Sequence, residues 1–189
     1  MIVKNTSLDG VKIITPTVFE DERGYFFESY KTPIFKNNEL PINFVQDNEV
    51  KSTKGVLRGL HYQFNRPQGK LVRVVSGSIL DVAVDIRKGS PTFGQYVSVK
   101  LTGENKKQLL VPRGFAHGFV VLEDDTVFAY KVDNYYSPEC DRGIAFDDEA
   151  LNIDWILNHD ELNLSAKDKV QPKLNETNDL FEYGINYYE

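Results

Sequence analysis

Short runs of alternating or continuous apolar residues recur along most of this 189-residue chain. Glycine, proline and acidic residues separate the runs, as at Ser76–Ser78 and Gly103–Asn105. Short strands at regular spacing with turns between them predict a sandwich or a barrel, and this order of strands and turns is typical of a jelly roll. The expected strands cover residues 11–14, 17–19, 43–50, 70–75, 79–86, 96–101, 108–112, 117–122 and 126–132, and residues 21–30 predict a charged turn that enters an aromatic strand.

Helical structure is expected in only a few places. Residues 35–40 predict a short helix that Pro41 would end, because proline cannot continue a helix. Further helical turns are expected at residues 150–156 and 160–162, where the chain is polar with a few apolar anchors. One anchor, Trp155, is expected to pack over the barrel.

Length and composition favour one globular domain over residues 1–189. Aromatic residues make up 12% of the chain and charged residues 26%, which is typical of a folded protein. The polar tail from Gln171 onward is expected to be partly mobile.

Charge, cysteine count and hydropathy restrict the partners and the compartment. A formal net charge of -6 disfavours a general nucleic-acid binder but permits a local basic pocket for a phosphorylated ligand. The single cysteine, Cys140, cannot form an internal disulfide, which predicts a reducing compartment. No apolar run reaches the length of a membrane span, and the first five residues lack the apolar segment of a signal peptide. A cytoplasmic protein with no nucleic-acid or membrane partner is therefore expected.

Candidate chemistry begins in residues 54–63, which bring an arginine, a histidine and an amide onto an apolar, β-prone run. Residues two apart on a strand share a face. His61 and Arg58 would thus point to opposite faces, unless a bulge at Gly59 shifts the phase. Taken alone, His61 fits a hydrogen-bonded core residue as well as a group that moves protons near neutral pH. Lys70, which follows after a turn, favours the second interpretation.

Spacing alone does not show whether His61 and Lys70 meet the later candidates Tyr130 and Asp168. Inward-pointing strand residues of a small barrel could converge. On the residues alone, Tyr130 is better interpreted as a packed tyrosine with its hydroxyl at the rim, and Lys70 as a solvated turn lysine.

Several groups of residues, in order along the chain, resemble the dTDP-4-dehydrorhamnose 3,5-epimerase family. They are residues 21–24 with Glu28, 45–48, 55–63, 68–73, 81–87, 112–119, 130–131 with 135–139, 141–144 and 164–168. The resemblance covers about residues 10–175, the expected core of the domain. It implies an all-β, cupin-like jelly-roll barrel (a double-stranded β-helix) with short C-terminal helical segments. It also implies a homodimer that shares its N-terminal arm, so that Arg23 would reach a neighbour's site.

The resemblance implies an activity: cofactor-independent epimerisation at C3, C5 or both of a nucleoside-diphosphate-linked 4-keto sugar, in the synthesis of surface polysaccharides such as lipopolysaccharide or capsule. The catalytic positions that it implies are His61 (the base), Asp168 (the carboxylate that orients the base), Tyr130 (the acid on the opposite face of the sugar) and Lys70 (the cation near the C4 oxygen). The substrate-binding positions are Arg23, Phe26, Glu28, Gln46, Asn48, Arg58 and Tyr136, and the supporting pair is His117 and Asp81.

A cupin metal site would need two histidines at HxH spacing, a glutamate and a later histidine. Gln63 stands where the second histidine would be, and no carboxylate follows at the expected spacing. His117 would be a nearly isolated ligand, and His159 lies in a polar loop without a matching partner. The sequence therefore predicts neither a metal nor another cofactor.

Other functions remain open. A related barrel could be a 3,4-ketoisomerase, which also enolises its sugar, or a non-catalytic sugar-nucleotide binding module. A metal-dependent dioxygenase is disfavoured by Gln63. Residues 49–52 and 145–146 depart from the family pattern, and the loop before Gln68 is a residue shorter than usual. These departures leave open the nucleotide base and whether the sugar is a hexose or a heptose.

Overall fold

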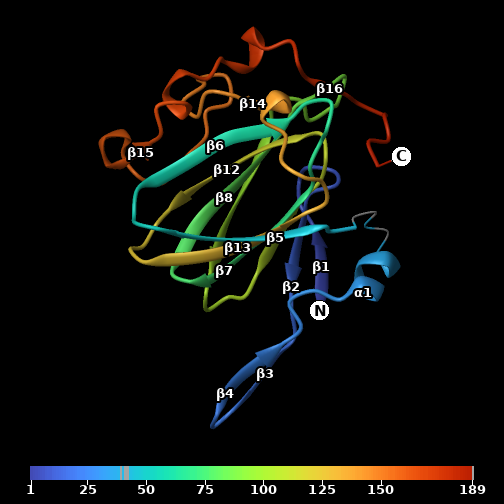
Figure 1. Ribbon diagram of the computed structural model, residues 1–189, viewed down its shortest axis with the longest axis vertical. Coiled ribbons are helices and arrows are strands. Elements are labelled where there is room, and N and C mark those ends of the chain that lie inside the picture. Colours follow the sequence, from blue (N-terminus) through green and yellow to red (C-terminus); the bar gives the residue numbers. More distant parts are fainter. Residues whose placement is uncertain (39, 41–42, 189) are drawn as a thin grey trace.

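Two β-sheets packed face to face form the body of the protein (Figure 1). The computed structural model describes residues 1–38, 40 and 43–188. The first sheet is antiparallel, with the order β1 (Ile2–Asn5), β2 (Lys12–Thr15), β11 (Gln108–Val111), β7 (Lys70–Ser76), β13 (Thr126–Val132) and β5 (Gln46–Ser52). The second has the order β10 (Tyr96–Thr102), β8 (Ser78–Asp85), β12 (Phe115–Val121), β6 (Val56–Gln63) and β14 (Asp141–Gly143), and β15 (Asn163–Leu164) runs parallel to β6. The predicted all-β jelly roll is confirmed.

The bounds of most expected strands agree with the structure to within three residues. The expected range 126–132 coincides with β13, β7 differs from expectation by one residue at its end, and β8 is shifted by one residue at both ends. The short strands β1, β14, β15 and β16 (Phe181–Glu182) were not expected. Strands of two to four residues carry too few positions for alternation to be recognised.

The described residues form three hydrophobic clusters, and two of them cover the two faces of the second sheet. Val72 and Phe128 of the first sheet meet Ile79, Ala83 and Phe119 of the second in the layer between the sheets. The other face of the second sheet is also apolar, and a second layer covers it. The residues of that second layer include Leu57, Leu60, Tyr62, Leu80, Val82, Val84, Trp155, Leu174 and Phe181. Every residue of β8 is therefore buried, as expected for a strand covered on both faces.

The C-terminal quarter of the chain supplies that cover (Figure 1). It contains the short 3-10 helices η1 (Pro138–Cys140), η2 (His159–Glu161), η3 (Asp168–Val170) and η4 (Leu174–Glu176). The expected turn at 160–162 corresponds to η2. Strand β16 pairs with β9 (Arg87–Lys88) and ties the end of the chain to the barrel. The tail from Gln171, which was expected to be partly mobile, buries Leu174, Leu180 and Phe181 against the body.

The helical turn expected at residues 150–156 is shorter than predicted: a bond from the Asn152 N–H to the Asp148 carbonyl at 3.0 Å closes one turn, which ends at Asn152. Asn152 and Ile156 have positive φ angles of 47° and 68°, and left-handed residues cannot continue a right-handed helix. Trp155 nevertheless packs over the barrel as expected, with its Nε1 donating a hydrogen bond to the Phe146 carbonyl at 2.9 Å.

Helix α1 (Thr32–Asn37) begins and ends earlier than the expected range 35–40. Pro33 lies in its first turn, where a missing N–H costs nothing. Asn38 ends the helix, with its side-chain amide donating to a carbonyl of the preceding turn at 2.8 Å. Pro41, the expected stop, lies outside the described residues.

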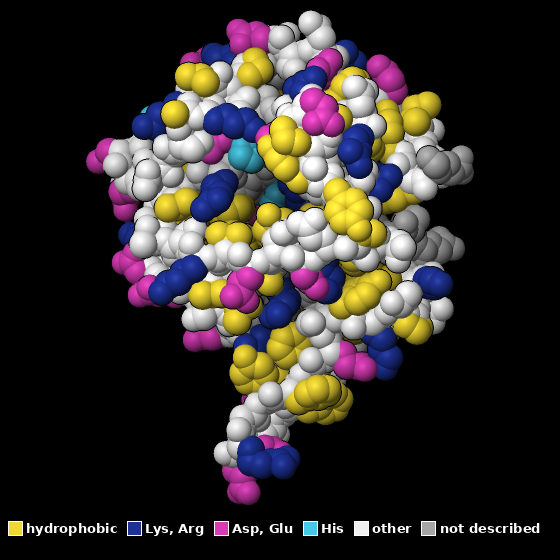
Figure 2. Space-filling view, viewed as in Figure 1, with side chains coloured by type: hydrophobic (Ala, Val, Ile, Leu, Met, Phe, Trp, Pro, Cys, Tyr) yellow, Lys and Arg dark blue, Asp and Glu magenta, His cyan; other side chains and the backbone are white. Residues whose placement is uncertain are grey.

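A hairpin of β3 (Val18–Asp21) and β4 (Gly24–Phe27) projects from the body (Figure 1). Figure 2 shows hydrophobic side chains along this projection and charged ones at its tip. Phe19 and Phe26 are 62% and 65% exposed, and Arg23 at the tip pairs with Asp21. In the part of the chain that the structure describes, no helix has the length and apolarity needed to cross a bilayer.

Candidate active site

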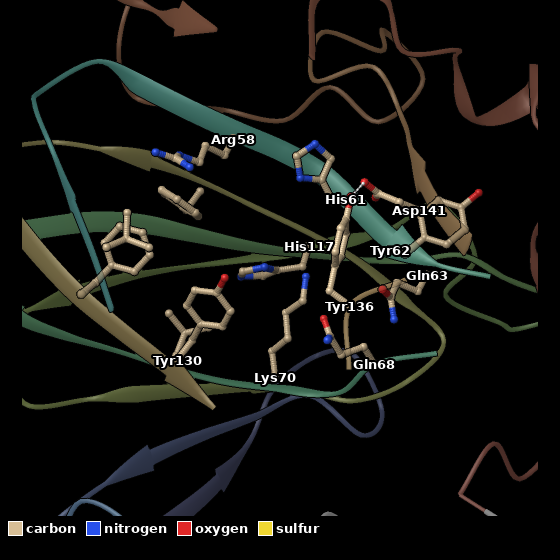
Figure 3. Close-up of a pocket in the computed structure, with 14 residues that line it drawn as sticks. Arg58, His61, Tyr62, Gln63, Gln68, Lys70, His117, Tyr130, Tyr136 and Asp141 are labelled. Atoms are coloured by element: carbon tan, nitrogen blue, oxygen red, sulfur yellow. Dashed lines mark hydrogen bonds between the residues drawn. The ribbon is translucent and has the colours of Figure 1, made fainter. Parts of the chain in front are cut away.

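A cavity of about 230 Å³ opens between the two sheets (Figure 3). It is lined by Val50, Arg58, His61, Tyr62, Gln63, Gln68, Lys70, Val72, His117, Phe119, Phe128, Tyr130, Tyr136 and Asp141. Figure 2 shows histidine side chains inside a hollow on this face of the molecule. Apolar residues of the inner layer form its floor, so polar groups that reach into it lie in a partly water-excluded space.

A β-bulge at Gly59 directs both Arg58 and His61 into this cavity. His117 pairs with His61 and Phe119 with Arg58, so β6 has one more residue than β12 over this interval. Gly59 has a φ of 131°, and a Cβ there would lie 2.5 Å from the Cα of Gly118. Only glycine suits such a conformation and so close an approach. Of the two phases that the sequence allowed for β6, the bulged one is observed.

His61 is held by a carboxylate from the far end of the chain. Its Nε2 lies 2.6 Å from Oδ1 of Asp168, and Ser165 Oγ donates to the other carboxylate oxygen at 2.8 Å. Burial favours a higher pKa for Asp168, but the hydrogen bonds from His61 and Ser165 and the charges of His61 and Lys167 outweigh it and lower this pKa. The ionised carboxylate accepts from Nε2–H, which leaves the lone pair of His61 on Nδ1.

Tyr130 enters the cavity from β13 in the first sheet, whereas His61 enters from β6 in the second (Figure 3). The two side chains therefore belong to opposite walls. Burial raises the pKa of Tyr130, and the nearby charge of Arg58 only partly offsets this. The tyrosine keeps its proton at neutral pH and is a potential proton donor.

Lys70 begins β7 and extends its side chain into the cavity (Figure 3). Burial lowers the pKa of Lys70 to about 8, although the carboxylates of Asp81 and Asp141 pull it upward. Among the described residues, none forms a hydrogen bond or an ion pair with Nζ. An ammonium group without a fixed partner in a cavity is free to interact with a ligand oxygen.

His117 and Asp81 form a second, more deeply buried pair, with His117 Nε2 2.8 Å from Asp81 Oδ1. Burial lowers the pKa of His117, against the opposing effect of Asp81. The other oxygen of Asp81 is buried, and no described residue hydrogen-bonds to it. The imidazole is neutral at pH 7, and Figure 3 shows it beside the amine end of the Lys70 side chain.

Gln63, at the position of a cupin metal ligand, has a different set of partners here. Its amide nitrogen donates to the carbonyls of Arg66 and Tyr135 at 2.8 and 3.2 Å, and its oxygen accepts from the N–H of Ser137 at 2.7 Å. These bonds hold two turns beside the cavity. Across the described ranges, no group of three or more His, Cys, Asp or Glu side chains is arranged to hold a metal ion.

The substrate-binding candidates fall into three places. Arg58 and Tyr136 line the cavity itself. Gln46 and Asn48 lie on the edge strand β5, joined by a 2.8 Å hydrogen bond, and Asn48 is opposite Tyr130 in the ladder. Arg23, Phe26 and Glu28 lie on or next to the projecting hairpin and are not among the cavity's lining residues.

Asp141 is a cavity residue to which the sequence assigned no role. It accepts a hydrogen bond from Tyr136 Oη at 2.9 Å and forms an ion pair with Lys167. It thereby connects a tyrosine at the mouth of the cavity with the segment that carries Asp168. The family-like motif at residues 141–144 was the only available signal, and it carried no information about these contacts.

Fold and cavity together define a cupin-like jelly-roll protein with acid–base groups on facing walls. The family model described as dTDP-4-dehydrorhamnose 3,5-epimerase matches residues 5–176. The chain belongs to this family of isomerases.

Similar proteins agree with this assignment. A relative from Salmonella typhimurium, named dTDP-4-dehydrorhamnose 3,5-epimerase, is 53% identical over 180 residues, which are 93% of this chain and 97% of the relative. The structure of dTDP-6-deoxy-D-glucose-3,5-epimerase from Legionella pneumophila, in complex with dTDP-4-keto-L-rhamnose, is 49% identical with a TM-score of 0.93 and covers 97% of this chain and 99% of its own. A 3'-monoepimerase from Streptomyces bikiniensis, in complex with dTDP-quinovose, is 31% identical with a TM-score of 0.83, covering 90% and 86%.

Proposed function

We propose that this protein inverts C3 and C5 of a dTDP-linked 4-keto-6-deoxy sugar without a cofactor. The names and ligands of its relatives support the nucleotide and the sugar class. The observation that carries the mechanism is the position of two proton-transfer groups on opposite walls of one cavity. These groups are His61, held by Asp168, and Tyr130.

The reaction uses the acidity of hydrogens beside a ketone. His61 Nδ1 takes the proton from C3 or C5, and the C–H electron pair forms a carbon–carbon double bond with negative charge on the C4 oxygen. The ammonium of Lys70 stabilises this enolate, an interaction that is stronger in the intermediate than in the ketone. Tyr130 returns a proton from the other face, which inverts the centre with no net oxidation.

Substrate binding follows from charge and shape. The Arg58 guanidinium offers a planar fork of donors that suits a diphosphate. Tyr136 lines the cavity, and Gln46 and Asn48 lie on the edge strand β5, where Asn48 is opposite Tyr130 in the ladder. All three are proposed to contact the nucleotide or the sugar.

Proton NMR in deuterium oxide tests this proposal with dTDP- and GDP-linked 4-keto sugars as candidates. Loss of the C3 and C5 signals in the wild type, but not in His61→Asn, is the expected result with the dTDP sugar. Exchange at C3 alone would agree with a monoepimerase and would contradict inversion of both centres. Analysis of the products separates epimerisation from a 3,4-keto shift, and tight binding without exchange would instead indicate a binding module.

The hairpin supports a second part of the proposal, a homodimer in which each arm completes the neighbour's site. Arg23 and Phe26 are exposed far along the projection, and neither is among the residues that line the cavity of their own chain. Aromatic side chains this exposed are typical of protein–protein contacts. The proposed role in surface polysaccharide synthesis and the reducing compartment stay predictions.

A further inference from the structure

Several hydrogen bonds attach the turn before Lys70 to the residues that follow β13, and a buried carboxylate accepts one of them. Asp133 Oδ1 accepts the N–H of Gly69 at 2.7 Å, and the N–H of Asp133 donates to the Gly69 carbonyl at 3.2 Å. The Asp133 carboxyl group is 2% exposed. Gln68 adds a third bond, from its amide to the Asn134 carbonyl at 2.6 Å. The backbone that leads into Lys70 is thus fixed from one side.

Arg113 neutralises that carboxylate. Its Nε lies 3.0 Å from Asp133 Oδ2, and its side chain is 16% exposed. Burial raises the pKa of Asp133, and the lowering effects of Arg113 and the Gly69 N–H do not cancel this. The carboxylate consequently depends on the guanidinium, because a buried charge without its partner is strongly unfavourable.

The last residues of the chain hold Arg113 in place. Its Nη1 donates to the Tyr187 carbonyl at 2.6 Å, and its backbone N–H donates to Tyr188 Oη at 3.1 Å. The guanidinium carbon also lies 4.9 Å from the centre of the Tyr188 ring. Burial raises the pKa of Tyr188 to about 12, so its hydroxyl remains a neutral acceptor.

The same tyrosine borders the turn directly. A Cβ placed on Gly69 would lie 3.4 Å from Tyr188 Oη and 2.9 Å from Asp133 Oδ2. Tyr188 therefore closes the space behind Gly69 as well as holding Arg113. Both tyrosines lie beyond residues 5–176, the part that the family model matches.

We propose that Tyr187 and Tyr188 are positioning residues that act on Lys70 through Arg113 and Asp133. The C-terminal end holds the arginine, the arginine holds the carboxylate, and the carboxylate holds the backbone next to Lys70. The inference rests on the proposed function, in which Lys70 faces the C4 oxygen. Removing the end would loosen the Lys70 turn without touching the cavity.

The test is a truncation after Gly184 together with Tyr188→Ala and Tyr188→Phe, each assayed for deuterium exchange into the dTDP-linked 4-keto sugar. Misplacing a charge stabiliser by a fraction of an ångström predicts a loss of roughly 10- to 100-fold in kcat for the truncation, with KM nearly unchanged. Tyr188→Phe, which keeps the ring, is expected to lose less. Ile185→Ala is the matched control, because Ile185 lies on the same segment and is 59% exposed.

A double-mutant cycle separates positioning from general stabilisation. In a Lys70→Met background the truncation is expected to cause no further loss, because its effect passes through Lys70. An unchanged kcat, or losses that multiply, would overturn the proposal. Should the truncated chain fail to fold, Tyr188→Ala serves in the same cycle.

A second measurement does not depend on activity. NMR of protein labelled with ¹³C at the lysine Cε reports the pKa of Lys70, which faces Asp81, Asp141, His61 and His117. Loosening the turn admits water, so the truncation is expected to move this pKa from about 8 toward the ordinary 10.5. If the wild-type protein causes no deuterium exchange into the sugar, the proposed function is wrong. In that case an unchanged Lys70 pKa in the truncated protein would also overturn the positioning role, whereas a raised Lys70 pKa would still support it.

Discussion

His61 Nε2 and Asp168 Oδ1 lie 2.6 Å apart although 107 residues separate them in the chain. The β6 bulge directs the histidine into the cavity, and helix η3 carries the aspartate to it. The pairing sets the tautomer of the histidine, so that Nδ1 is the atom available to accept a proton.

Asp168→Asn is expected to lower kcat by roughly 10²- to 10⁴-fold while KM changes little. The amide keeps the shape of the carboxylate but stabilises neither the required tautomer nor the imidazolium. Ser165→Ala is the milder control, because it removes a hydroxyl that donates to the Asp168 carboxylate and accepts the Asp168 N–H but leaves the carboxylate itself in place. Steady-state kinetics measure both, and equal activity of Asp168→Asn and wild type would contradict the dyad.

The rate of deuterium exchange into the sugar is expected to fall as the pH rises, because Lys70 loses its charge. Its pKa of about 8 means that the cation is lost above that pH, so exchange should decline along an alkaline limb with a midpoint near 8. The limb should be absent in Lys70→Met, whose residual rate is low at every pH. A profile that rises through pH 8 would assign Lys70 a role as a base instead.

Replacing Lys70 by an apolar residue is expected to raise the free energy of unfolding. The folded pKa of Lys70 is about 8 and its ordinary value 10.5, so the unfolded chain binds more protons between these values and stability rises with pH there. Lys70→Met should therefore be more stable than the wild type at pH 7, by on the order of 1–3 kcal/mol. Urea denaturation at pH 7 and pH 10 measures the difference, which should shrink at the higher pH.

Tyr130→Phe separates the base from the acid. His61 can still remove a proton and return it to the same face, so deuterium exchange is expected to continue while inversion stops. Combined NMR and product analysis detects this difference. Tyr96→Phe is a matched control, since its hydroxyl only accepts the N–H of Asp154. Loss of exchange and inversion together in Tyr130→Phe would mean that Tyr130 is needed for the first step as well.

Mixed dimers test the exchanged arm. If Arg23 completes a neighbour's site, an equal mixture of Arg23→Ala and His61→Asn chains forms heterodimers with one intact site. Random pairing then restores about a quarter of wild-type activity. Two inactive preparations that stay inactive after unfolding and remixing would mean that Arg23 and His61 serve the same chain, or that the chain is a monomer.

Local patterns determined the strands of this protein. Apolar residues recur over seven or eight positions in β8 and β13, and this pattern can be recognised without knowing which strands pair. The bounds of α1 and the conformation of residues 150–156 were less predictable. Pro33 is compatible with the first turn of a helix as well as with a loop, and the sequence does not show that Asn152 and Ile156 adopt positive φ angles. Short strands such as β16 exist only because a neighbour is present to pair with them.

Some features of the site were likewise predictable from the sequence, and others depend on the tertiary structure. By itself, the sequence determined which residue types were available for acid–base chemistry, and a family resemblance identified their order. Only the tertiary structure decided that Arg58 and His61 share a face, because the bulge depends on how closely Gly59 approaches Gly118. The lowered pKa of Lys70 and its link to Tyr188 through Arg113 also required the fold, since burial and long-range contacts arise only when the strands and the C-terminal end pack together.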